Sequence, residues 1–140
     1  MKKHILGIIG AAIFFGAAIG AAVFFAEPLP IFEHEWTFVF NFMERTPDGI
    51  VEHKDFCEGE KEKALVEVLS RARRKRHKDV VSTTKDIKYI IYLQSKEGFL
   101  TVNLWEGGGE FQNEPTGLGY AITNPNQLMA EIEALLEENN

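Results

Sequence analysis

The chain has 140 residues, a formal net charge of −6 and a single cysteine, Cys57. One cysteine excludes an intrachain disulfide, so the folded part has to be held together by its core. The length that follows the first apolar segment suits one small domain and leaves little room for a second.

The first feature along the chain is an unbroken apolar run over residues 5–26. At about 1.5 Å of rise per residue, a helix over this run is about 33 Å long, which is enough for the hydrocarbon core of a bilayer at about 30 Å. We therefore expect a transmembrane signal anchor over residues 1–26, with the membrane as a partner through residues 5–26.

A cleaved signal peptide is the alternative to a retained anchor. The apolar region of a signal peptide usually has about 7–15 residues, and this run is longer. Bulky Phe24 stands where a cut after Ala26 would need a small residue, whereas a cut after Ala22 would follow small side chains. The prediction is a retained anchor, and cleavage would make the protein secreted.

The charges that flank the run predict its orientation. Lys2 and Lys3 precede it, and glutamates follow it at positions 27, 33 and 35. The positive-inside rule then places the N-terminus in the cytoplasm and the remaining chain outside, in a single-pass protein of the cell membrane. A domain outside the cytoplasm excludes nucleic acid as a partner.

Small residues recur within the run at Ala12, Gly16 and Gly20, so they share one face of a helix. Such a face lets two helices approach closely, which indicates a weak homodimer through these three residues. The other interpretation is that Gly and Ala are simply common in membrane helices.

Residues 27–35 form a short linker that is stiffened by two prolines, and a domain over residues 36–140 follows. Alternate residues at its start are aromatic: Trp36, Phe38, Phe40 and Phe42. In a strand they would line one face, so we expect an aromatic face packed on the core. Residues 46–49, Thr-Pro-Asp-Gly, are typical of a turn.

A helix is expected from about residue 56 to residue 74. Asp55 with Glu58 three residues later resembles a capping box, although Asp replaces the usual Ser or Thr. Four apolar residues recur at helical spacing and form the predicted buried stripe: Leu65, Val68, Leu69 and Ala72.

A meander of strands should come next, after a polar loop over residues 80–85. The predicted strands lie at residues 87–93, 99–105, 110–113 and 119–123. A turn at residues 96–98 makes the first two a hairpin, and the glycines at 107–109 make the next turn.

A second helix closes the chain. Asn124 is a good N-cap, Pro125 fits the first helical position, and Gln127 completes a capping-box pattern. Its apolar stripe is Leu128, Ile132, Leu135 and Leu136. The order strand, helix, meander, helix predicts an α+β fold, with a small antiparallel sheet and two helices on one face.

Candidate chemistry centres on His53 and Cys57, which are four residues apart and would share a helix face. They could supply two metal ligands, but no second pair stands at a zinc-like spacing. The serines lack the context of a nucleophile elbow, and no glycine-rich segment precedes Lys-Ser or Lys-Thr. We therefore assign no catalytic residue, no metal and no cofactor.

A basic segment over residues 71–78 stands out from the acidic background. Its charged residues are Arg71, Arg73, Arg74, Lys75, Arg76 and Lys78. Outside the cytoplasm such a segment could bind anionic lipid or an anionic surface polymer. The other interpretation is a solvated helix end, because cations late in a helix complement its dipole.

From residue 56 onward the order of elements resembles a known family. The segments that carry the likeness are residues 64–69, 86–93, 104–108 and 114–122, and the most specific stretch runs from Pro115 to Tyr120. The chain resembles the small extracytoplasmic α+β domain of uncharacterised Gram-positive single-pass and lipid-anchored proteins. The same module is similar to the outer tail of some membrane-metallopeptidase antirepressors. The resemblance implies a fold and a location, and it transfers no catalytic residue.

Together these features predict a non-enzymatic single-pass membrane protein whose outward domain binds or senses at the cell surface, with a protein or an anionic surface polymer as its partner. The alternative is an inhibitor or immunity-type domain that acts on an extracytoplasmic enzyme.

Overall fold

The computed structural model describes residues 29–30, 37–80, 86–95, 98–113 and 118–138. The expected anchor at 1–26 lies outside these ranges, and so does most of the linker at 27–35. Within the described ranges, no helix is both long and apolar enough to cross a membrane.

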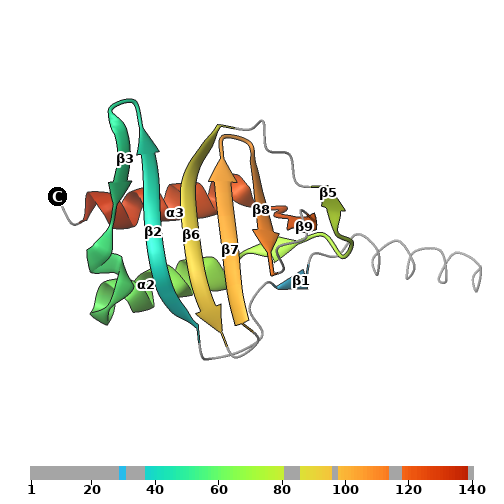
Figure 1. Ribbon diagram of the computed structural model, residues 1–140, viewed down its shortest axis with the longest axis horizontal. Coiled ribbons are helices and arrows are strands. Elements are labelled where there is room, and N and C mark those ends of the chain that lie inside the picture. The colour runs from blue at the N-terminus through green and yellow to red at the C-terminus, as the bar shows by residue number, and fades with distance from the viewer. Residues whose placement is uncertain (1–28, 31–36, 81–85, 96–97, 114–117, 139–140) are drawn as a thin grey trace, which may run out of the picture.

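The described residues place seven strands in one antiparallel sheet, in the order β3-β2-β6-β7-β8-β9-β5 (Figure 1). Their bounds are β2 (Phe38–Thr46), β3 (Gly49–Glu52), β5 (Asp79–Val80), β6 (Ile87–Ser95), β7 (Gly98–Trp105), β8 (Gly108–Gln112) and β9 (Leu118–Ala121). Two helices, α2 (Gly59–Ser70) and α3 (Pro125–Glu137), contact each other and cover one face of this sheet (Figure 1). The predicted α+β fold with an antiparallel sheet and two helices is confirmed.

The predicted meander is also present. Strands β6 and β7 pair as the expected hairpin, and β8 and β9 continue it. Strand β3 was not expected, and it pairs with β2 across the turn predicted at residues 46–49. Residues 79–80 form β5 against β9, so Val80 lies in a strand and not in the predicted loop; residues 81–85 lie outside the described ranges.

The core face of β2 differs from the prediction. Val39 pairs with Leu93 but Asn41 pairs with the adjacent Tyr92, so Phe40 is an extra residue in a β-bulge. One extra residue reverses the alternation of side chains along a strand. Val39 and Phe42 are therefore buried, whereas Phe40 is 67% exposed.

The predicted aromatic face is thus wrong for Phe38 and Phe40, which lie on the sheet face away from the helices, with 52% of Phe38 exposed. Trp36 lies outside the described residues. Only Phe42 of the four aromatics is shown to contact the core, where its ring packs against Phe56 and Tyr89.

The predicted helix at 56–74 is shorter and is interrupted at its start. A 3₁₀ turn, η1 (Lys54–Cys57), comes first, and the extended backbone of Glu58 separates it from α2. Gly59 opens α2 at a φ of +68°, a left-handed conformation that favours glycine. Asp55 makes no capping bond, so the predicted capping box is wrong; its carboxylate pairs with Lys61.

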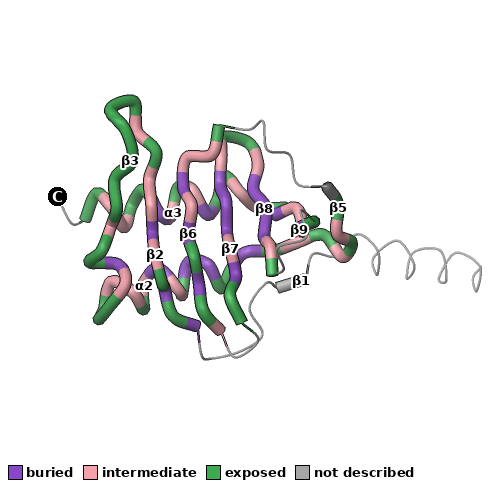
Figure 2. Tube along the Cα trace, in the orientation of Figure 1, coloured by how far each residue is buried: buried purple, intermediate pink, exposed green. Residues whose placement is uncertain are grey.

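Apolar side chains between the sheet and the two helices form the core, and Figure 2 shows the buried positions along the central strands. Its fully buried large residues are Phe42, Phe56, Leu65, Leu69, Tyr89, Ile91, Leu93, Val102, Leu104, Leu128 and Ile132. The apolar stripes predicted for the helices are confirmed at Leu65, Val68 and Leu69 of α2 and at Leu128 and Ile132 of α3, with Leu135 and Leu136 partly buried beside the core. Ala72 is buried as predicted, but it lies beyond the end of α2.

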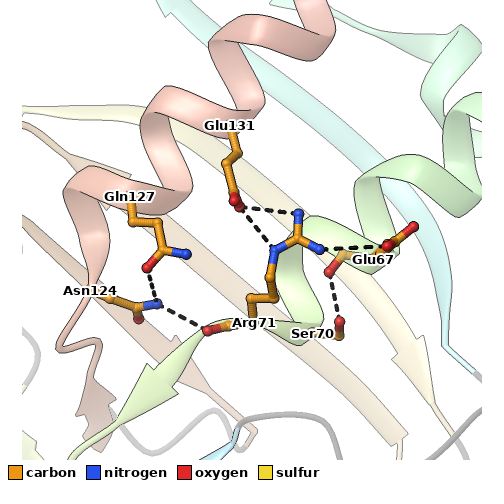
Figure 3. A network of polar contacts seen from close by, with 6 residues as sticks. All are labelled: Glu67, Ser70, Arg71, Asn124, Gln127 and Glu131. Atoms are coloured by element: carbon orange, nitrogen blue, oxygen red, sulfur yellow. Dashed lines mark hydrogen bonds and ion pairs between the residues drawn. The ribbon is translucent and has the colours of Figure 1, made fainter.

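The first turn of α3 is tied to the end of α2 (Figure 3). Asn124 is the N-cap residue as predicted, but its side chain makes no capping bond. Its amide instead accepts a hydrogen bond from the Arg73 backbone N–H at 2.8 Å and donates one to the Arg71 carbonyl at 2.9 Å. The Arg71 guanidinium then lies between Glu131 of α3 and Glu67 of α2.

Candidate functional site

A cleft of about 410 Å³ opens beside β2, β6, η1 and the last turns of α3. Its lining residues are Glu44, His53, Asp55, Phe56, Lys88, Tyr89, Glu133, Leu136 and Glu137. Four of these are carboxylates, and one is a lysine. The cleft therefore combines a partly apolar wall with fixed polar groups, as binding sites for small ligands generally do.

His53 is held in place from three sides. Its ring Nε2 lies 2.9 Å from the Glu44 carboxylate, and its backbone N–H donates to the Phe42 carbonyl at 2.8 Å. The ring also packs against Phe42 and Phe56, with centroids 4.9 and 6.2 Å away. A carboxylate and an aromatic wall together fix the imidazole, so it presents its other ring nitrogen in a defined direction.

A second polar pair stands on the α3 side of the cleft. The Lys88 ammonium donates to Glu133 at 2.8 Å, and this hydrogen bond raises the pKa of Lys88. The same ammonium lies 5.2 Å from the centroid of the Tyr89 ring. Burial raises the pKa of the Tyr89 phenol, so Tyr89 is a neutral hydrogen-bonding group at physiological pH.

Cys57 and His53 do not converge as the spacing suggested. The Cys57 thiol lies 3.9 Å from the carbonyl oxygens of Phe40 and His53. Burial raises the pKa of this thiol, which disfavours the thiolate that a metal or an electrophile would need. In the part of the chain that the structure describes, no three His, Cys, Asp or Glu residues are grouped to hold a metal ion. His4 and His34 lie outside it.

The basic segment is not the end of a helix. Helix α2 ends at Ser70, so only Arg71 has the position that the dipole interpretation requires. Arg73 and Arg74 form β4, whose backbone pairs with β1 (Leu29–Pro30). The Arg74 guanidinium stacks on the ring of Tyr120 at 3.9 Å.

The open face of the sheet carries exposed aromatic side chains that sequence reasoning placed in the core or did not consider. Phe38, Phe40 and Phe99 are 52%, 67% and 64% exposed, and we call them the aromatic patch. The rings of Phe40 and Phe99 meet edge to face with centroids 6.0 Å apart. The bulge in β2 turns Phe38 and Phe40 to the open face, and the alternating pattern of aromatic residues in the sequence does not indicate that a bulge is present.

Comparison with known proteins yields no matching family model, no matching curated protein and no matching solved structure. The resemblance to extracytoplasmic α+β domains therefore stays a prediction, and any functional assignment has to be argued from the geometry of the cleft.

Proposed function

We propose that the protein is a non-enzymatic, single-pass membrane protein whose outward α+β domain binds a ligand at the cell surface. The anchor and its orientation are supported by the apolar run over residues 5–26 and by the lysines that precede it. Binding is supported by the cleft, whose polar groups are already fixed by pairing and packing.

The charge of the cleft carries the proposal. Glu133 pairs with Lys88 and Asp55 pairs with Lys61, so the excess negative charge of the cleft comes from Glu44 and Glu137, which line it from β2 and α3. An excess of negative charge around a concave site attracts cations and orients their N–H donors. The ligand class that fits is therefore a group with an ammonium or guanidinium, such as a polyamine or a basic peptide side chain.

The experiment is calorimetric titration of the full chain, held in nanodiscs of phosphatidylcholine, with spermine as the cationic probe. Glu44→Gln combined with Glu137→Gln should weaken spermine binding by at least about tenfold, since losing even one hydrogen bond to a charged group costs about 1.5–3 kcal/mol and about 1.4 kcal/mol is a factor of ten. The matched control, Asp48→Asn with Glu106→Gln, removes the same charge from exposed turns and should leave affinity nearly unchanged.

Two results would contradict the assignment. If the wild-type chain gives no heat with spermine, the cleft is not a cation site. If the cleft variant and the control variant lose affinity equally, the protein attracts spermine through its net charge and not through the cleft.

The aromatic patch favours the alternative function, an inhibitor or immunity-type domain that covers an extracytoplasmic enzyme. Aromatic residues are enriched at the centres of protein interfaces. A photoreactive amino acid at position 40 should then crosslink to an enzyme in intact cells. The purified chain should inhibit that enzyme, and Phe40→Ser should not. If position 40 crosslinks to no enzyme, the inhibitor alternative is ruled out.

A further inference from the structure

We infer that the basic segment, residues 71–78, binds the anionic lipid headgroups of the membrane in which the protein is anchored. The inference rests on the proposed anchoring through residues 5–26. The two can be tested separately, because binding to headgroups can fail while the protein remains in the membrane.

The pairing of β1 with β4 places the basic segment next to the anchor. Leu29 pairs with Arg74 and Pro30 pairs with Arg73. Leu29 follows Ala26, the last residue of the expected anchor, by only three positions. At about 3.3–3.6 Å per residue, even a fully extended chain keeps Leu29 within roughly 10 Å of the end of the apolar run. The strand spacing of about 4.8 Å then keeps the paired backbone of β4 within roughly 15 Å of it, which is under about two Debye lengths at physiological ionic strength.

The sequence separation conceals this proximity. The positive-inside rule counts basic residues within about 15–20 positions of a membrane segment, and the basic segment begins at position 71, far beyond that window. The fold brings it back, because the strand pair joins residues 29–30 to residues 73–74. These cations therefore lie beside the bilayer without opposing the orientation predicted from the flanking charges.

The basic segment is also fixed to the rest of the domain. The Lys75 N–H donates to the Ala121 carbonyl at 2.9 Å, and the Thr123 N–H donates to the Arg73 carbonyl at 2.9 Å. The Arg74 guanidinium and the Lys78 ammonium lie 3.9 and 5.4 Å from the Tyr120 ring. A segment held in this way loses little further conformational entropy when it meets a charged surface.

The position of the basic segment next to the expected anchor favours lipid headgroups over a soluble polymer as its ligand. A soluble polyanion could bind a basic segment anywhere on the domain, whereas lipid headgroups can reach only a segment near the anchor. Lys75 is exposed, and clusters of Lys and Arg next to a membrane segment bind anionic headgroups through their summed charge.

The experiment uses the full chain in nanodiscs of phosphatidylcholine, with and without phosphatidylglycerol. A neutral reagent, the N-hydroxysuccinimide ester of acetic acid, acetylates exposed lysines, and mass spectrometry gives the rate at each one. An anionic surface keeps an adjacent amine protonated and unreactive. Lys75 should therefore react about three- to sevenfold more slowly in discs with phosphatidylglycerol. The internal control is Lys54, whose side chain is 87% exposed in η1, before the start of α2.

We expect phosphatidylglycerol to slow the acetylation of Lys75 and to leave the acetylation rate of Lys54 unchanged. The slowing at Lys75 should disappear in about 0.5 M salt, which screens exposed charges. Equal Lys75 rates in both discs overturn the inference, and so does equal slowing at both lysines. In a further arm, polyphosphate or inorganic phosphate is added to discs without phosphatidylglycerol. If either soluble anion slows the acetylation of Lys75 as much as phosphatidylglycerol does, the basic segment binds soluble anions and not headgroups. A chain that separates from the discs would overturn both the anchoring and the headgroup contact.

Discussion

Glu110 on β8 is a buried carboxylate, with 5% of its surface exposed. It accepts a hydrogen bond from the Asn103 amide of β7 at 2.9 Å and a longer one from Gln112 at 3.5 Å. Burial raises the pKa of Glu110 because the charged form is poorly solvated there, and the two hydrogen bonds oppose this only in part.

The raised pKa gives Glu110 a definite effect on stability. The folded state binds the proton more tightly than the unfolded state, so this group favours folding at low pH and less so as the pH rises through the folded-state pKa. Glu110→Gln should therefore stabilise the protein by about 1 kcal/mol at pH 7 relative to wild type, with the gain vanishing below about pH 4. Urea denaturation of the full chain in a non-ionic detergent, at pH 7 and at pH 4, measures this difference in the free energy of unfolding. Glu106→Gln in the adjacent exposed turn is the control, and a gain that is larger at pH 4 would contradict the sign.

The bulge in β2 gives two neighbouring phenylalanines opposite roles. Because Phe42 is fully buried, Phe42→Ala should lower the free energy of unfolding by about 3–5 kcal/mol. Phe40 is largely exposed, so Phe40→Ala should lower it by less than about 1 kcal/mol. The same denaturation experiment compares the two variants side by side. A large loss for Phe40→Ala would mean that the alternating pattern, and not the bulge, describes the strand.

At the scale of elements, the sequence predicted what depends on long periodic segments. The hairpin of β6 and β7 and the apolar stripes of both helices follow from side-chain periodicity, and all are present. The bulge, η1 and β3 were missed. Each depends on one or two residues, such as Phe40 and Glu58, whose conformation is decided by tertiary contacts and not by local pattern.

Asn124 joins two elements, and its removal should loosen their junction. Asn124→Ala deletes the bonds to the Arg73 N–H and the Arg71 carbonyl and should cost about 1–2 kcal/mol. Asn124→Asp keeps the acceptor but loses the donor, so it should cost less. Asn126→Ala, on the exposed start of α3, should change the free energy of unfolding by under about 0.5 kcal/mol. If Asn124→Ala lowers the free energy of unfolding no more than Asn126→Ala does, the two hydrogen bonds of the junction contribute nothing to stability.

At the scale of the whole molecule, neither candidate surface could be predicted from the sequence. The cleft draws Glu44, His53, Lys88 and Glu133 from separate parts of the chain, and no pair of them has a spacing that indicates contact. The basic segment was recognised, but its proposed position beside the expected anchor depends on the pairing of residues 29–30 with 73–74. Long-range pairing of this kind is set by the fold, which a single sequence does not display.

The central claim is that a retained anchor holds the domain outside the cytoplasm, and cysteine labelling tests it most directly. In a Cys57→Ser background, Lys54→Cys and Lys3→Cys each provide a single thiol, one on the domain and one before the apolar run. A membrane-impermeant maleimide should label Lys54→Cys in intact cells and Lys3→Cys only after lysis, with both chains in the membrane fraction. Labelling of Lys3→Cys but not Lys54→Cys in intact cells would contradict the orientation. A mature chain that has lost position 3 and leaves the membrane would contradict the anchor.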